Sequence, residues 1–237
     1  MPKPSALSSA RLLLLAGIPV ACTAYAAVRY HIFAGVPWQD FPLFIVNKGI
    51  SYAAVCLIAA SYLVHRLGLA DSATIEDRRI LARGAGLGGV ALAVVHVLIS
   101  FEIFVPSRYP SLLLSEGLSA SGWVCLWTGA LASGLFGLPA VYSFPRLLPT
   151  LGAAHWGRAQ QLGYWALGLT ALHALSIGAG NWPTPSRWPG GLPPISLLSF
   201  IVCLVPIGAK VFALVTAGPG RGGNPVITPH PIEDPWR

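Results

Sequence analysis

Long apolar stretches separated by short polar segments dominate the pattern along this chain. An α-helix needs about 20 mostly apolar residues to cross a bilayer core of about 30 Å. Six stretches meet this requirement approximately, and we predict transmembrane helices at Leu12–Val28, Pro42–Val64, Gly84–Val105, Gly122–Phe144, Leu162–Ala179 and Ile195–Ala217. The predicted fold class is an all-α polytopic membrane protein, with a six-helix bundle at residues 1–217 and a flexible cytoplasmic tail at residues 218–237.

Composition supports lipid as the solvent of this chain. Charged residues make up 10% of the 237 positions, whereas about a quarter of the residues of a soluble domain are charged. The net charge of +7 is spread over many short loops, so we expect no binding to nucleic acid, which requires a clustered basic face. The cysteines show no metal-ligand spacing and are interpreted as small apolar residues of the spans; they are Cys22, Cys56, Cys125 and Cys203.

Basic residues predict the orientation of the spans. The N-terminus, the second and fourth loops and the tail carry ten Lys and Arg, against three in the other loops. Cytoplasmic segments carry the excess of positive charge, so we expect an integral plasma (inner) membrane protein with both termini in the cytoplasm, which requires an even number of spans. The first stretch follows Lys3 and Arg11 and also resembles a secretory signal; we keep it as a span.

Two histidines lie inside predicted spans, where ionisable side chains are costly and usually functional. His96 lies 13 residues beyond Arg83, and His173 lies 15 residues beyond Arg158. At 1.5 Å per residue these offsets are about 20 Å and about 22 Å, so both imidazoles reach one depth. Two imidazoles at one level can ligate one iron from opposite sides, which predicts one haem b with His96 and His173 as the metal ligands. The alternative is that each histidine only hydrogen-bonds to a neighbouring helix.

Residues around the two histidines refine this hypothesis. Small residues would let a flat porphyrin approach the backbone, and they are Gly88, Gly89, Gly129, Gly134 and Gly168. A second haem would need another histidine 13 or 14 residues away on each helix, and those cytoplasmic-side positions hold no histidine. Asn47 and Lys48 lie at about the same level and are candidate contacts for a haem propionate, with hydrogen bonding between helices as the alternative.

Several short runs occur in one order along the chain: Ile45-Val46-Asn47-Lys48, His96-Val97, Ser107-Arg108-Tyr109, Gly129 to Pro145 with Gly134-Leu135 inside it, and Leu162-Gly163-Tyr164 followed by His173. From about Pro42 to Lys210 the sequence resembles the STEAP metalloreductases (six-transmembrane epithelial antigen of the prostate), within the ferric-reductase-like membrane domains. His96 and His173 match the two axial haem ligands of that family.

The resemblance implies an electron relay through haem b. In the family, NADPH reduces a flavin at the cytoplasmic face, the flavin reduces the haem, and the haem reduces Fe(III), Cu(II) or oxygen outside. The turn before the fifth span matches the place where the family binds FAD, and its residues Trp156, Arg158, Gln160 and Gln161 are candidate contacts for FAD or another flavin. Lys210 is a further candidate, for a flavin phosphate, with snorkelling to lipid headgroups as the alternative. The family forms trimers, which implies a homo-oligomer.

We therefore expect a haem-dependent metalloreductase that carries electrons from a cytoplasmic donor to a metal ion or chelate at the outer face. The chain has no Gly-x-Gly-x-x-Gly motif that follows a predicted strand, as a nucleotide-binding domain requires, so a separate cytoplasmic flavin/NAD(P)H reductase is the expected partner, besides membrane lipid. Two alternatives stay open. The chain is a haem-containing membrane subunit that passes electrons to a periplasmic protein or exchanges them with quinone, or it is a haem-free scaffold or transporter.

Overall fold

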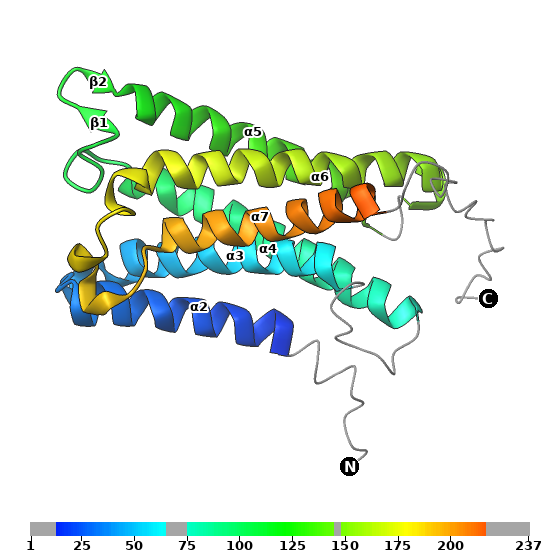
Figure 1. Ribbon diagram of the computed structural model, residues 1–237, viewed down its shortest axis with the longest axis horizontal. Helices are drawn as coiled ribbons and strands as arrows, with labels where there is room; N and C mark the ends of the chain where they lie inside the picture. The colour runs from blue at the N-terminus through cyan, green and yellow to red at the C-terminus, as the bar shows by residue number, and fades with distance from the viewer. Residues whose placement is uncertain (1–12, 65–74, 145–147, 217–237) are drawn as a thin grey trace, which may run out of the picture.

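The computed structural model describes residues 13–64, 75–144 and 148–216, without the side chains of residues 13, 75, 76, 148–154 and 156. The described part is mostly helical, and Figure 1 shows the long helices lying side by side along the longest axis of the molecule. The predicted cytoplasmic tail at residues 218–237 lies outside the described residues.

The long helices are α2 (Ile18–Ala26), α3 (Val46–Leu63), α4 (Ile75–Ile103), α5 (Ala120–Tyr142), α6 (Leu148–Gly178) and α7 (Ile195–Thr216). Wider π-helical turns at Leu13–Gly17 and Ala27–Phe33 extend α2, and another at Phe41–Ile45 precedes α3. A small hairpin of β1 (Leu113–Leu114) and β2 (Gly117–Leu118) stands between α4 and α5. The connection before α7 is irregular and contains short 3₁₀ turns at Ala179–Asn181, Pro185–Arg187 and Pro189–Gly191.

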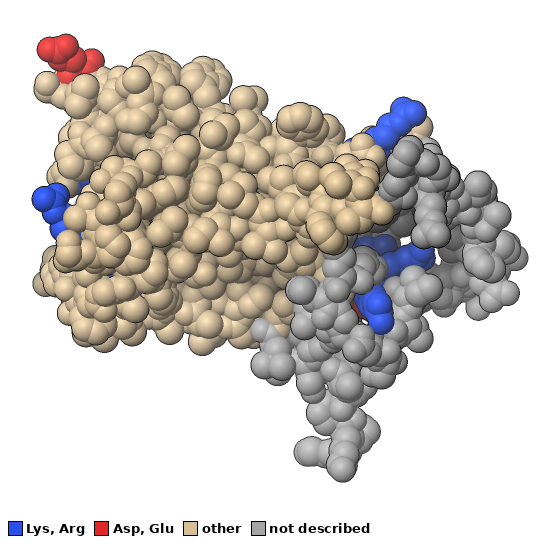
Figure 2. Space-filling view, in the orientation of Figure 1, with Lys and Arg blue, Asp and Glu red and all other residues tan. Residues whose placement is uncertain are grey.

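Five helical stretches are long and apolar enough to cross a membrane: Trp38–Leu63, Asp77–Ile103, Ala120–Tyr142, Gly157–Asn181 and Pro189–Thr216. By length and composition they indicate an all-α integral membrane protein. Figure 2 shows the same character at the surface, because the visible charged side chains gather at the two ends and leave an uncharged band between them. The predicted first span corresponds to the helical run Leu13–Phe33, which lies beside α3 in Figure 1 but is not one of the five, so a sixth span stays a prediction.

Two helices begin well before the spans predicted for them. α4 begins at Ile75 rather than Gly84, and α6 begins at Leu148 rather than Leu162. The expected cytoplasmic turn at Trp156–Gln161 is therefore wrong, because these residues lie within α6. Its sequence explains the difference, since Leu, Ala and Gln favour helix and a proline at the second position suits a first turn. A hydropathy pattern detects only the apolar part of a helix and not the more polar turns that continue it.

Close packing joins α3 to α4 through glycine. A Cβ at Gly89 would lie 2.7 Å from Ile58 Cγ1 and 2.9 Å from the Ala54 carbonyl oxygen. A Cβ at Gly88 would lie 3.3 Å from Leu15 Cδ2. The small size of these two glycines therefore serves packing against neighbouring helices, and the expectation that they face a porphyrin is wrong.

The bundle consists of two groups of helices. α3 packs against α2 and α4, and α6 packs against α5 and α7. The two groups meet mainly where α3 contacts α7, through a core of Ile58, Phe136, Ala166, Leu167, Ala171 and Cys203. Among the described residues, α4 and α6 make little direct contact with each other. His96 lies on α4 and His173 lies on α6, so the two histidines come from different groups.

Candidate functional site

His96 is held by hydrogen bonds from α3 and from its own helix. Its Nδ1 lies 2.9 Å from Asn47 Oδ1, and Asn47 is only 1% exposed. Asn47 Nδ2 donates to Ser100 Oγ at 3.1 Å, and the Ser100 hydroxyl donates to the His96 carbonyl at 2.7 Å. Because the amide nitrogen of Asn47 is directed at Ser100, its oxygen faces the imidazole and can only accept. Nδ1 of His96 therefore carries the proton.

His173 is held against α5 by a backbone carbonyl. Its Nδ1 lies 2.9 Å from the Cys125 carbonyl oxygen, with the Cys125 sulfur at 3.6 Å. A carbonyl oxygen can only accept, so Nδ1 of His173 is also the protonated nitrogen. Gly129, one turn after Cys125, makes this approach possible, because a Cβ there would lie 2.9 Å from Nδ1 and 3.1 Å from Cε1 of His173.

On both histidines, Nε2 is the ring nitrogen that makes no hydrogen bond to the described residues. No fully buried side-chain nitrogen or oxygen of the described residues lacks a partner, so neither Nε2 is fully buried. His173 is near enough to His96 to act electrostatically on its imidazole. Metal-binding histidines commonly donate one ring N–H to an oxygen and ligate through the other nitrogen. Both side chains have this arrangement.

Lys48 provides a positive charge beside the pair of histidines. Its ammonium group acts electrostatically on both imidazoles. It donates to the Tyr109 hydroxyl at 3.1 Å and lies 5.3 Å from the centre of the Phe44 ring. Lys48 is half-buried, and the described residues give it no carboxylate partner. Lys48 is therefore suited to an anionic group that reaches this level of the bundle.

Lys48 is contacted by Tyr109, from the loop between α4 and the β1–β2 hairpin. Tyr109 packs against Phe44 with ring centres 6.5 Å apart. The neighbouring Arg108 donates a hydrogen bond to the carboxylate of Asp40, and this bond raises the pKa of the Arg108 guanidinium above its ordinary value. Residues 108–109 are thereby tied to the start of the α3 segment by two polar contacts.

An apolar hollow of about 130 Å³ lies between α4 and α5, lined by Val90, Ala93, Val94, Val97, Leu98, Ser133 and Phe136. His96 is not among the residues that line this hollow. Its volume is below the roughly 300–1,000 Å³ of usual ligand pockets, and it would take only the edge of a large cofactor. At Gly134, Gly137 and Gly168 a Cβ would meet nothing within 4 Å, so α5 and α6 also leave open space.

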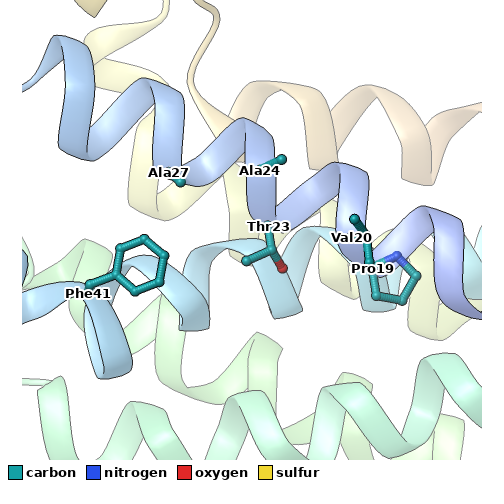
Figure 3. A pocket seen from close by; sticks show the side chains of 6 residues that line it. All are labelled: Pro19, Val20, Thr23, Ala24, Ala27 and Phe41. Carbon is teal, nitrogen blue, oxygen red and sulfur yellow. The ribbon is translucent and has the colours of Figure 1, made fainter.

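A larger hollow of about 370 Å³ lies on the outer face of α2. Figure 3 shows its lining: Pro19, Val20, Thr23 and Ala24 from α2, Ala27 from the turn that extends α2, and Phe41. It contains neither His96 nor His173 and has no charged residue in its lining. We assign it no part in the site.

The predicted flavin contacts lie toward the far end of the same helices. Lys210 Nζ lies 5.8 Å from the centre of the Tyr164 ring, and that ring packs against Tyr62 at 4.7 Å between centres. The Tyr62 hydroxyl donates to the Gln160 carbonyl at 3.3 Å. Lys210 and Gln160 are thus linked through Tyr164 and Tyr62, of which only Tyr164 belongs to a run noted in the sequence.

The remaining flavin candidates are less connected. Arg158 and Gln161 are exposed, and the side chain of Trp156 lies outside the described residues. The flavin role of these residues stays a prediction.

Ser100 and Cys125 contact the histidines but were not predicted as site residues from the sequence. Ser100 is one turn beyond His96, and a serine at that spacing is a detectable signal for a hydrogen bond to the histidine's carbonyl. Cys125 acts through its backbone carbonyl, which no residue type indicates. Asn47 was expected as a propionate contact, but its amide is engaged by His96 and Ser100.

The donor set restricts the kind of metal centre. The described residues contain no group of three or more His, Cys, Asp or Glu side chains arranged to hold a metal ion. A centre built on His96 and His173 therefore needs a cofactor that brings most of its own ligands, as a porphyrin does. No protein-family model and no curated protein matches this sequence.

Proposed function

We propose that this chain is a transmembrane electron carrier that holds one haem b between His96 and His173. The observation that carries the proposal is the matched state of the two imidazoles. In each, Nδ1 donates to an oxygen of a neighbouring helix, at 2.9 Å in both cases. Each Nε2 is thereby left with its lone pair, which is the form that ligates iron.

The surrounding residues support a haem rather than a bare metal ion. α4 and α6, which carry one ligand each, make little direct contact with each other. No charged side chain lines the hollow between α4 and α5, and at Gly134, Gly137 and Gly168 a Cβ would meet nothing within 4 Å. Lys48, which has no carboxylate partner among the described residues, suits a propionate.

Haem bound in this way alternates between Fe(III) and Fe(II) and carries one electron at a time. With both axial positions occupied by imidazole there is no vacant position for a substrate, so electron transfer is favoured over chemistry on a coordinated molecule. The residues of the chain orient the two imidazoles, keep each Nδ1 protonated and exclude water with apolar side chains. Lys48 adds a fixed positive charge beside them.

The direction of transfer follows from the resemblance to the STEAP metalloreductases and from the distribution of charge. We propose entry of electrons at the end that carries Arg158 and Lys210, which the positive-inside rule assigns to the cytoplasm. A separate flavin-linked reductase supplies them, and Fe(III), Cu(II) or oxygen accepts them at the opposite end.

The absorption spectrum of the purified protein tests the haem. We expect a sharp Soret band that shifts on reduction with dithionite, and its loss in His96→Ala and in His173→Ala. His31→Ala is the matched control, because His31 Nδ1 also bonds a carbonyl, that of Val36 at 2.8 Å, but lies in the helical run before α3. A colourless wild-type protein from haem-replete cells contradicts the proposal and leaves the scaffold or transporter alternative.

The acceptor is tested after the haem has been reduced. Anaerobic protein with ferrous haem is mixed with ferric citrate, with cupric ions, and with a quinone, and reoxidation is followed at the Soret band. Rapid reoxidation by the metal ions supports metalloreductase activity. A haem that stays reduced with metals and is reoxidised by quinone supports the membrane-subunit alternative instead.

A further inference from the structure

The two candidate iron ligands are anchored by acceptors of different kinds. His173 donates to a backbone carbonyl, that of Cys125 at 2.9 Å. His96 donates to a side-chain amide, that of Asn47 at 2.9 Å. A backbone carbonyl inside a helix has a fixed position and chemistry, whereas a side-chain acceptor can change with the residue.

The Asn47 side chain is fixed by burial and by hydrogen bonds at both ends of its amide. It is 1% exposed, its nitrogen donates to Ser100 Oγ at 3.1 Å, and Ser100 is itself fixed to the His96 carbonyl at 2.7 Å. His96, Asn47 and Ser100 therefore form a closed ring of hydrogen bonds across α3 and α4. The Ser100 hydroxyl donates its one hydrogen to the His96 carbonyl and can therefore only accept from Asn47, so the amide nitrogen faces Ser100 and the amide oxygen faces Nδ1 of His96.

We infer that Asn47, oriented by Ser100, is a positioning residue that sets the donor strength of His96 and thereby the reduction potential of the haem. The inference rests on the proposed function and deepens it. The acceptor at Nδ1–H controls how much negative charge the imidazole presents at Nε2, since a stronger acceptor makes the imidazole a more basic ligand. A more basic ligand stabilises Fe(III) over Fe(II) and lowers the potential.

The inference assigns the control of potential to one side of the haem. On the α6 side the acceptor is a main-chain oxygen, and substitution of Cys125 leaves that oxygen in place. On the α4 side the nearer acceptor is the Asn47 side chain, at 2.9 Å, with Ser100 Oγ at 3.4 Å. The two ligands are chemically identical, yet only for His96 does a side-chain substitution change the chemistry of the acceptor itself.

Redox titration of the purified holoprotein tests this, with Asn47→Asp and Asn47→Leu as opposite changes. Asp gives an anionic acceptor and should lower the midpoint potential, while Leu removes the acceptor and should raise it. Outer partners of metal ligands typically change affinity or activity by about 10-fold or more, so we expect about a tenfold shift of the Fe(III)/Fe(II) equilibrium each way, or about 59 mV for one electron. Ser100→Ala should raise the potential by less, because the amide loses its orienting partner.

Ser176→Ala is the matched control. Ser176 donates to the His173 carbonyl at 2.8 Å, as Ser100 does for His96, and it also interacts with the Cys125 thiol. The acceptor of the His173 Nδ1–H is the Cys125 carbonyl, which loss of the Ser176 hydroxyl leaves in place. The midpoint of this variant should equal that of the wild type. Low-spin ferric EPR spectra serve as a second readout, and their g values should move in Asn47→Asp and not in Ser176→Ala.

The outcomes separate this inference from the proposed function. Wild-type protein without haem contradicts the proposed function itself. Haem that binds to the wild type and to the Asn47 variants with one unchanged midpoint contradicts the inference and leaves the proposed function intact. A shift of the same sign in Asn47→Asp and Asn47→Leu also contradicts it, because a merely structural disturbance would not follow the charge of the acceptor.

Discussion

At the scale of single residues, the placement of His173 depends on a missing methyl group. Its imidazole lies where a Cβ of residue 129 would otherwise be, 2.9 Å from Nδ1. Only glycine at this position lets the ring reach the Cys125 carbonyl across the surface of α5. The hydrogen bond, the protonated nitrogen and the direction of Nε2 all follow from that contact.

Gly129→Ala is therefore expected to displace the imidazole of His173. In an open helix position, glycine to alanine is stabilising by up to about 1 kcal/mol, but overpacking of a filled site costs about 1–3 kcal/mol. We expect a lower ratio of Soret to protein absorbance and a lower melting temperature in detergent. Gly134→Ala, on the same helix but with nothing within 4 Å of its Cβ, should match or exceed the wild type in both. Equal behaviour of the two variants contradicts the account.

The residues of the site could be predicted only in part. His96 and His173 were found because ionisable groups are rare in apolar stretches, and Lys48 was found for the same reason. The roles of Asn47, Ser100 and Cys125 depend on which helix faces share an interface and on the direction of each side chain. Periodicity and hydropathy give no information on shared helix faces or on side-chain directions. Asn47 was therefore assigned to a propionate instead of to the imidazole.

At the scale of helices, the predicted ends were accurate for α5 and α7, and the predicted starts were wrong for α4 and α6. The predicted ends of α5 and α7 agree with the structure to within two residues, because lipid-suited sequence and helix end together there. α4 and α6 continue beyond their apolar parts, through segments rich in Ala, Leu, Arg and Gln that favour helix without favouring lipid. Hydropathy cannot place a helix end that lies in water.

Packing between helices gives an element-scale prediction at Gly89. Alanine there should force α3 and α4 apart, because its Cβ would lie 2.9 Å from the fixed Ala54 carbonyl oxygen. We expect a loss of about 1–3 kcal/mol in the free energy of unfolding, measured by thermal or denaturant unfolding in detergent. Gly208→Ala in α7, where a Cβ meets nothing within 4 Å, should be neutral or stabilising. A destabilised Gly208→Ala beside a stable Gly89→Ala would contradict this packing.

At the scale of the whole molecule, the arrangement agrees with a bundle that crosses the bilayer repeatedly. Figure 1 shows that α2 starts and α7 ends at one end of the bundle, while the β1–β2 hairpin stands at the other. Five of the helical stretches suit a bilayer by length and hydropathy. The count of basic residues favours the end with the start of α2 and the end of α7 as cytoplasmic.

This orientation predicts the labelling of single cysteines in intact cells. Glu116→Cys in the β1–β2 turn should react with a membrane-impermeant maleimide added outside, and Arg158→Cys only after permeabilisation. Both positions are exposed, whereas Cys22, Cys125 and Cys203 are buried, and the wild type gives the background. The reverse pattern would contradict the orientation, and labelling of both variants in intact cells would contradict the crossing between them.

The division of the bundle has a consequence for biogenesis. One histidine comes from the group formed by α2, α3 and α4, and the other from the group formed by α5, α6 and α7. A cofactor held by both would add a second link between the two groups, besides the core where α3 meets α7. Cellular iron supply would then govern how much intact protein accumulates, and fragments severed between α4 and α5 would reassemble when haem is provided.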